Sequence, residues 1–289
     1  MILAPLRGVT VRRFRRTFGA IAAECGFTEA VAPFVAAMRG VDPLKDPELK
    51  PGGDDGPLET TPQLIGKDPA ALRDALLRLR DAGYARVDLN CGCPFPMVRK
   101  KGRGSGLLKT PDVLARMLET GCETMGPGNF SAKTRLGLES PRELAALMPV
   151  FNSFPLARLA IHARTAAQMY SGECDREAFL EAYSAARMPV VYNGDVETGA
   201  GGCERPAWLP AEAGIMAGRG FVRHLGRRED SPLLLGNYIR DSLRDGMQSG
   251  AVLGRMKELA CYWTDVPRWA EFWRRAKKER TLAGFERLI

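Results

Sequence analysis

Eight short apolar runs recur along the first 220 residues, and this repetition constrains the fold more than any other feature of the chain. Each run is about as long as a buried strand. They cover residues 2–4, 29–34, 62–65, 86–89, 130–133, 159–162, 189–192 and 214–217. Eight strand–helix units in 220 residues average under 28 residues each, which suits parallel strands joined by helical crossovers. The pattern therefore predicts an α/β fold with a parallel sheet.

Most gaps between the runs carry helical patterns. Three of them open with a polar residue followed by proline, a pair typical of a helix start, at Asp68-Pro69, Thr110-Pro111 and Ser140-Pro141. An open doubly wound sheet and a closed eight-stranded barrel both fit this alternation. The count of eight favours the (β/α)8 TIM barrel, whose typical length is roughly 250 residues.

The strand signal stops after Gly220. Residues 233–243, 252–263 and 267–288 are expected to form helices rich in Arg, Lys and aromatic residues. We therefore expect a barrel domain over residues 1–221 and a small all-helical domain over residues 222–289. From Arg219 to Ile289 the chain has 15 Lys and Arg against 9 Asp and Glu, so this last quarter holds +6 of the net charge of +8. Such a basic module indicates an anionic partner, most often nucleic acid, although a solvated helical surface explains the charge equally well.

The cysteine and histidine contents exclude several kinds of site. The seven Cys are odd in number and mostly scattered, which favours reduced thiols over a disulfide framework. Two His, His162 and His224, nearly exclude a zinc site built on several histidines. No stretch approaches the ~20 apolar residues that span a membrane, and no signal peptide is visible at the start of the chain. We therefore expect a cytoplasmic protein.

Polar residues follow nearly every predicted strand. In a TIM barrel these positions share the face that carries the chemistry. The positions are Pro5 to Gly8, Gln63, Asp88 to Pro94, Lys133 to Arg135, His162 to Arg164, Asn193 to Asp195 and Gly218 to Gly220. Each alone is an ordinary strand end or turn, but together they predict one site. The glycines after the last two strands favour phosphate binding through backbone N–H groups, to which Arg219 adds a bidentate contact.

The stretch from Asn90 to Pro94 contains a Cys-x-Cys pair, Cys91 and Cys93. Two thiolates without a second pair and with few histidines do not complete a tetrahedral metal shell, so we expect no metal and a single reactive cysteine on this loop. The following segment 98–106 is basic and Gly-rich, which fits a mobile loop facing an anionic polymer and an ordinary surface loop equally well. The Gly- and Pro-rich segment 50–61 is expected to be an exposed loop.

These residues give the chain a family likeness: it resembles the tRNA-dihydrouridine synthases. The matching stretches occur in family order, from residue 2 to about 220, and the helical tail agrees. They begin at Ala4, Phe14, Gln63, Asp88, Gly102, Lys133, His162, Asn193 and Gly218. The stretch from Tyr170 to Gly172 departs from the family, since it leads to Asp175-Arg176 where an Asp-Trp pair is common. The tail is also short for the family, and the segment 50–61 is peculiar to this chain.

The resemblance implies an FMN-bearing barrel with a helical tRNA-binding domain, which reduces a uridine of tRNA with NADPH as electron donor. It implies that Cys93 is the catalytic acid. Cofactor contacts are implied for Pro5, Leu6, Arg7, Gln63, Asn90, Lys133, His162, Asn193, Gly194, Asp195, Gly218 and Arg219. Substrate contacts are expected from Lys133, Arg135 and Arg164. The basic run near the chain end adds Arg275 and Lys278 as contacts to tRNA phosphates.

Two other interpretations stay open at this point. The chain fits a different FMN barrel that acts on a free small molecule, such as a dihydroorotate-dehydrogenase-like or ene-reductase-like enzyme, but a basic helical appendage is then unneeded. It also fits a tRNA-binding protein that kept the barrel without turnover, against which Cys93, Lys133 and His162 argue. We expect a monomer with no metal and no membrane contact.

Overall fold

The computed structural model describes residues 1–289 and contains ten strands, all paired in parallel. Each of the eight predicted runs contains a strand, in the predicted order, and two further short strands lie directly after the run 29–34 and directly before the run 62–65. The strands are β1 (Ile2–Leu3), β2 (Glu29–Val31), β3 (Val35–Ala36), β4 (Glu59–Thr61), β5 (Gln63–Ile65), β6 (Val87–Cys91), β7 (Phe130–Gly137), β8 (Leu159–Thr165), β9 (Val190–Asn193) and β10 (Gly214–Ala217).

The sheet closes on itself as a barrel. The strand order is β3-β5-β6-β7-β8-β9-β10-β1-β2-β4. Its two ends are formed by the same two stretches of chain: residues 29–36 carry β2 and β3, and residues 59–65 carry β4 and β5. β2 pairs with β4, and β3, which follows β2 closely, pairs with β5. Pro62 separates β4 from β5 because it has no N–H to donate, while its carbonyl accepts a bond of 2.8 Å from the Asp88 N–H. Ten strand segments thus occupy the eight strand positions, or staves, of a (β/α)8 barrel, as predicted.

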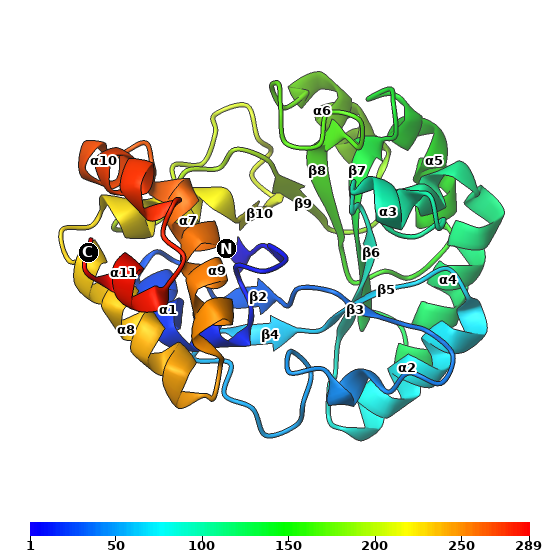
Figure 1. Ribbon diagram of the computed structural model, residues 1–289. Coiled ribbons are helices and arrows are strands. Elements are labelled where there is room, and N and C mark those ends of the chain that lie inside the picture. The colour runs from blue at the N-terminus through cyan, green and yellow to red at the C-terminus, as the bar shows by residue number, and fades with distance from the viewer.

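Helices cover the outside of the barrel and extend into the tail, with three short 3-10 segments among them (Figure 1). The helices are α1 (Arg12–Glu24), α2 (Pro69–Asp81), α3 (Pro96–Arg99), α4 (Pro111–Met125), α5 (Glu143–Asn152), α6 (Arg176–Ala185), α7 (Arg219–Arg227), α8 (Ser231–Arg244), α9 (Ser249–Ala260), α10 (Pro267–Ala276) and α11 (Leu282–Glu286). The 3-10 segments are η1 (Pro43–Lys45), η2 (Gly104–Lys109) and η3 (Cys261–Trp263). No helix is both long and apolar enough to cross a membrane.

The predicted helix starts have different outcomes. Asp68 caps α2, because its carboxylate accepts the Ala70 N–H at 3.0 Å. Thr110 precedes α4 without a side-chain cap. Ser140 does not begin a helix. Instead α5 begins at Glu143, whose carboxylate accepts the N–H groups of the three residues from Leu138 to Ser140.

Two segments were expected in a different form. Residues 50–61 do not form a loop throughout, because their last three residues are strand β4. The rest is tied to α1: Arg15, which is fully buried, pairs with Glu48 and Asp55, and Arg12 donates to the Lys50 carbonyl at 2.7 Å. Residues 267–288 form two helices, α10 and α11, in place of one.

The core of the barrel continues into the tail. One cluster of 68 buried residues extends from Leu3 to Phe285, and a small second cluster of six fills the barrel interior. α7 runs across the expected domain boundary at residue 222, and the Trp263 indole donates to the Val222 carbonyl at 2.7 Å. Figure 1 shows α8–α11 gathered on one side of the barrel beside α1, where Tyr238 packs against Phe18.

Candidate active site

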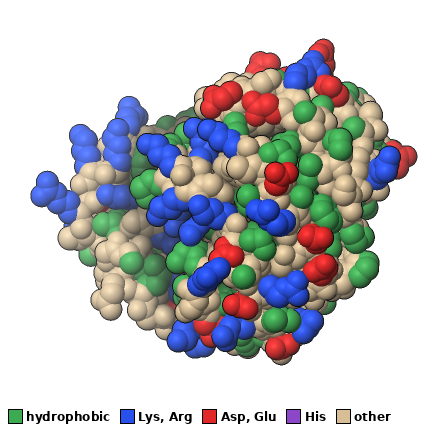
Figure 2. Space-filling model, turned by 90° about the vertical axis from the view of Figure 1, so that its right-hand side faces the viewer, with side chains coloured by type: hydrophobic (Ala, Val, Ile, Leu, Met, Phe, Trp, Pro, Cys, Tyr) green, Lys and Arg blue, Asp and Glu red, His purple; other side chains and the backbone are tan.

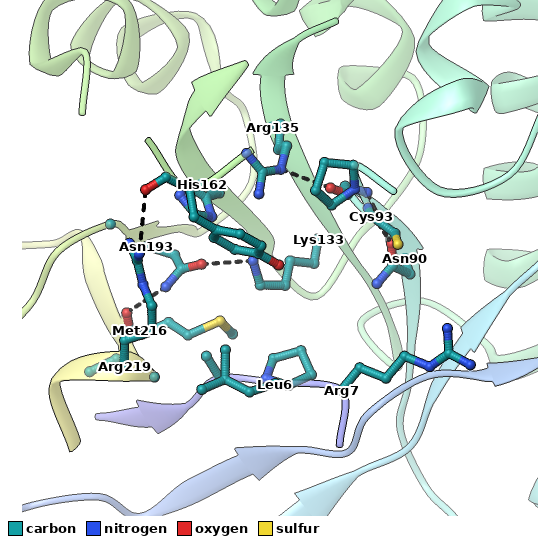
Figure 3. A pocket seen from close by; sticks show the side chains of 18 of the residues that line it. Leu6, Arg7, Asn90, Cys93, Lys133, Arg135, His162, Asn193, Met216 and Arg219 are labelled. Atoms are coloured by element: carbon teal, nitrogen blue, oxygen red, sulfur yellow. Dashed lines mark hydrogen bonds between the residues drawn. The ribbon is translucent and has the colours of Figure 1, made fainter. Parts of the chain in front are cut away.

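A pocket lies at the carboxyl ends of the strands, where the polar strand ends meet. It is open at its mouth and is lined by 23 residues, of which 9 are hydrophobic and the others supply polar groups. Thirteen predicted residues line it: Pro5, Leu6, Arg7, Asn90, Cys93, Lys133, Arg135, His162, Asn193, Gly194, Asp195, Gly218 and Arg219. Figure 3 shows Lys133 of β7, Asn193 of β9 and Cys93, in the loop after β6, around this space. The barrel thus brings together residues that lie far apart in the sequence.

Cys93 sits in the pocket wall with only 6% of its surface exposed. The Asn90 side-chain oxygen accepts the Cys93 N–H at 2.8 Å, and the Ser105 hydroxyl donates to the Cys93 carbonyl at 2.9 Å. Burial raises the pKa of the Cys93 thiol above its ordinary value, so at neutral pH the sulfur keeps its proton. Cys91, two residues earlier, is fully buried in the barrel wall away from the pocket.

The basic loop 98–106 is partly packed into the barrel. Its second half starts η2, and Gly104, Ser105 and Gly106 are buried. Gly104 has a φ of +57°, and a Cβ there would lie 2.8 Å from the Cys93 Cβ. Only glycine therefore allows this loop to press against the cysteine.

Behind the pocket, a buried hydrogen-bond network holds Asn90 in place. The Gln63 amide donates to Asp88 and accepts from Asn90, both at 2.8 Å, and the Ser131 hydroxyl donates to Asp88 at 2.6 Å. Burial raises the pKa of Asp88. Gln63 itself is completely buried and does not line the pocket.

Lys133 and His162 place titratable groups on the pocket floor. The Lys133 ammonium donates to the Asn193 side-chain oxygen at 2.7 Å, and Asn193 in turn donates to the Met216 carbonyl at 2.9 Å. Burial, assisted by the nearby Arg135 charge, lowers the pKa of Lys133 to about 7. Burial and the surrounding cations lower the pKa of His162 well below its ordinary value, so His162 is neutral. Both groups would be stabilised by a hydrogen bond to an anionic or carbonyl-bearing ligand.

Arg135 joins two loops across the pocket. Its guanidinium donates to the carbonyls of Gly92, Thr165 and Met169 at 2.9, 2.8 and 2.6 Å. Burial lowers the pKa of Arg135 to about 10. Its guanidinium also lies 5.2 Å from the centre of the Tyr170 ring. Arg135 therefore fixes the pocket wall while one side of it still faces the cavity.

Arg164 lies behind the pocket and is almost fully buried. It donates to the Gly172 carbonyl at 2.7 Å and forms an ion pair with Asp195. Asp195 also accepts from Arg219 at 2.7 Å, and these arginines hold the pKa of Asp195 below its usual range. Asp195 is thus the shared anchor of two cations, one behind the pocket and one at its edge.

Two backbone turns at one end of the pocket form a cradle for an anion. Asp195 adopts a positive φ of 39° after Gly194, and α7 begins at Arg219 directly after Gly218. A Cβ at Gly220 would lie 1.9 Å from the Val196 carbonyl oxygen, so the two turns approach as closely as glycine allows. The first N–H groups of a helix have no partner inside the helix. This cradle fits a phosphate group.

Sequence reasoning placed some residues elsewhere and missed others. Gln63 and Arg164, which were expected to contact a ligand, lie behind the pocket. Arg275 and Lys278 are exposed on the tail, where they were expected. The pocket is also lined by four residues with large side chains that we did not predict: Phe34, Phe95, Tyr170 and Met216. The departure at Tyr170 was the only sequence signal for any of them. No cluster of three or more His, Cys, Asp or Glu is arranged to hold a metal ion.

Comparisons with curated proteins confirm the resemblance. The family model described as dihydrouridine synthase (Dus) matches residues 2–227. The chain is 31% identical over 225 residues to a probable tRNA-dihydrouridine synthase of Rhodobacter capsulatus, covering 76% of this chain and 67% of that protein. It is 28% identical to a probable tRNA-dihydrouridine synthase of Rickettsia bellii, covering 94% and 88%. With tRNA-dihydrouridine synthase B of Vibrio vulnificus it shares 28% identity over 68% of this chain and 60% of that protein.

Among solved structures, morphinone reductase matches with a TM-score of 0.52 and 13% identity, covering 77% of this chain and 82% of that one. At this identity the likeness concerns the fold alone, and it supports the barrel architecture. The family match extends over all eight staves and the whole pocket. The chain therefore belongs to the dihydrouridine synthase family and is a flavin-dependent oxidoreductase.

Proposed function

We propose that the protein reduces a uridine of tRNA to 5,6-dihydrouridine, with FMN as its bound cofactor and NADPH as the electron donor. The observation that carries this proposal is a protonated thiol, Cys93, in the wall of a pocket that also holds a phosphate cradle and two titratable bases. The curated relatives are named as tRNA-dihydrouridine synthases, which supports the tRNA substrate. The same proposal places the protein in the cytoplasm.

The residues of the pocket fit FMN. The cradle at Gly194, Asp195, Gly218 and Arg219 suits the phosphate, and Asn193 lies between the cradle and Lys133. The apolar residues Pro5, Leu6 and Met216 line the pocket and suit the face of a flat ring. Figure 3 shows Leu6 and Met216 close together. Arg7, Asn90, Lys133 and His162 supply polar groups for the ring edges, and Gln63 orients Asn90 from behind.

When bound and reduced, FMN supplies a hydride to C6 of the uracil ring. The electron pair of the C5–C6 double bond then needs a proton at C5, and Cys93 donates it from its thiol. Because burial raises the Cys93 pKa, the thiol carries this proton at neutral pH, and the resulting thiolate regains a proton from water. Negative charge that develops on the uracil carbonyls is stabilised by Lys133 and Arg135.

Docking of the tRNA falls to the helical tail, residues 222–289. Arg275 and Lys278 are exposed near the end of α10 and form no ion pair. α9 reaches the barrel mouth, because a Cβ at Gly8 would lie 2.5 Å from the Glu258 carboxylate. An RNA held by the tail therefore lies close to the loop that follows β1, beside the pocket. Lys and Arg side chains also gather along one side of the face shown in Figure 2, which is the right-hand side of Figure 1 and lies opposite the tail.

Two measurements test the proposal. The purified protein should be yellow, with one non-covalently bound FMN per chain released on denaturation. Nucleoside analysis of tRNA from a host with and without the protein should show dihydrouridine at one or more positions that only the host with the protein modifies. A colourless protein that takes up no FMN, or identical dihydrouridine contents, would exclude the function.

A further inference from the structure

Large exposed apolar side chains concentrate at the carboxyl end of the barrel. Five of the eight such side chains follow the ends of strands there: Met38 and Val41 after β3, Phe95 and Met97 after β6, and Tyr170 after β8. Single exposed apolar residues are ordinary, but a concentration on one end marks an interaction surface. This surface surrounds the pocket mouth.

Phe95 is the member that lies nearest to the reacting thiol in the chain, two residues after Cys93. Phe95 and Cys93 line the same pocket, and 42% of Phe95 is exposed. Its carbonyl accepts the N–H groups of Val98 and Arg99 at 2.9 and 3.0 Å, which fixes the segment as the start of α3. The ring is therefore held at the mouth by a short helix and needs no rearrangement to meet a ligand.

Cations lie on the segments next to Phe95 and the pocket mouth. Arg7 lines the same pocket, where its guanidinium lies 5.2 Å from the centre of the Phe34 ring, and Lys67, Lys100 and Lys101 are exposed on the adjoining loops. The loops are joined, because Gly102 leaves room for the Lys67 stem, where a Cβ would lie 3.4 Å from the Lys67 Cδ. An apolar ring among unpaired cations is the surface that single-stranded nucleic acids bind, with bases stacked on the ring and phosphates near the cations. A purely apolar protein partner would leave these charges without counterions.

We propose that Phe95 stacks on the nucleobase next to the uridine that enters the pocket, and so selects a single-stranded context for reduction. This inference rests on the proposed function. A uridine that leaves its stack deprives its neighbour of a stacking partner, and the exposed ring beside Cys93 replaces that partner. Phe95 thereby acts on substrate choice, whereas Cys93 acts on the reaction.

The test compares Phe95→Leu, which keeps an apolar side chain but removes the ring, with Phe95→Tyr, which keeps the ring. Phe154→Leu is the matched control, because Phe154 is half-buried between α5 and β8 at the opposite end of the barrel. The substrate is bulk tRNA from a host that lacks this protein. The readouts are kcat/KM for dihydrouridine formation, the tRNA Kd across a salt series and bound FMN per chain.

Phe95→Leu should lower kcat/KM about 5- to 20-fold, the lower part of the range for removal of one base–aromatic stack. Phe95→Tyr and Phe154→Leu should stay within about twofold of the unchanged protein. The salt dependence of binding should not change, because no charge is removed. A Phe95→Leu protein within twofold of the unchanged one overturns the inference. An equal loss of kcat/KM in Phe95→Tyr also overturns it. So does a loss of bound FMN in Phe95→Leu that matches its loss of turnover, since either result would assign Phe95 a packing role. If the unchanged protein forms no dihydrouridine, the proposed function itself fails, an outcome distinct from these.

Discussion

Replacing Cys93 or Cys91 by alanine separates the chemical role of a thiol from its packing role. The two cysteines are of one type and two residues apart, but only Cys93 lines the pocket, while Cys91 is fully buried in the wall. We expect Cys93→Ala to retain FMN and its reduction by NADPH, and to lose rapid reduction of tRNA. Cys91→Ala should retain both reactions.

The magnitudes follow from the two environments. A positioned general acid contributes about 10²- to 10⁴-fold to a rate, so Cys93→Ala should slow single-turnover reduction of tRNA by that factor. Cys93→Ser should be nearly as slow, because a hydroxyl is a far weaker acid than a thiol. Cys91→Ala removes one buried sulfur and should cost about 1 kcal/mol of stability, by analogy with small core truncations. Its turnover should stay within about threefold of the unchanged protein, since a destabilisation of about 1 kcal/mol leaves the native state populated.

The assay mixes reduced enzyme with excess tRNA and follows dihydrouridine in a single turnover, over a range of pH. Because a general acid must carry its proton, the part of the rate that depends on Cys93 should fall only above the ordinary pKa of a thiol, since burial raises the pKa of Cys93. Equal losses in the two alanine variants with FMN retained would refute the assignment of Cys93. A fall below pH 8 that persists in the Lys133→Met variant would refute the reasoning from burial, because Lys133, whose pKa is about 7, loses its own charge in that range.

Three further predictions concern the cofactor, the floor and the tail. Gly220→Ala should weaken FMN binding at least tenfold in a titration of flavin-free protein, because the added carbon collides with a backbone carbonyl, whereas Gly254→Ala, in open space on α9, should not. In urea unfolding of flavin-free protein at pH 7, Lys133→Met should have a larger free energy of unfolding than the unchanged protein. This difference in free energy should narrow as the pH rises from 7 toward 10.5. In that range the folded protein has already released the Lys133 proton, and the unfolded chain progressively loses it too, so the unchanged protein gains stability. The double change Arg275→Ala and Lys278→Ala should lower the slope of log affinity for tRNA against log salt by about 0.7 to 0.9 for each phosphate that is no longer neutralised, and an unchanged slope would place docking elsewhere.

The sequence predicted the barrel well because its signals are local and repeated. Each stave is a short buried run, and the closed order follows from their number and from the right-handed parallel connection. The splits in two staves could not be predicted, because they depend on pairing across the sheet at Pro62 and on a register shift between β2 and β3. The break in the last helix of the tail was also missed, because the turn between α10 and α11 carries no Gly or Pro.

Roles inside the pocket were harder to predict than its position. Gln63 and Arg164 are polar residues of β5 and β8, yet their side chains bond to other protein groups, Asp88 and Asp195, behind the pocket. Whether a polar side chain faces the cavity or the wall depends on the pairing of strands that are distant in the sequence. Phe95 was missed for a different reason: an exposed aromatic ring carries no pattern until its neighbours in space are known.

The strongest indication of the site is that ionisable side chains are buried there, which lowers the stability of the free protein. β7 and β8 are buried along almost their whole length, as strands of a parallel barrel are, and such strands ordinarily carry apolar residues. These two instead carry Lys133, Arg135, His162 and Arg164, and burial lowers the pKa of the first three. Arg164 is paired with Asp195 and His162 is neutral, but Lys133 and Arg135 form no ion pair with a carboxylate. Buried cations without an ion-pair partner weaken the free protein, so the place of Lys133 and Arg135 in the barrel fits an anionic ligand that the pocket receives.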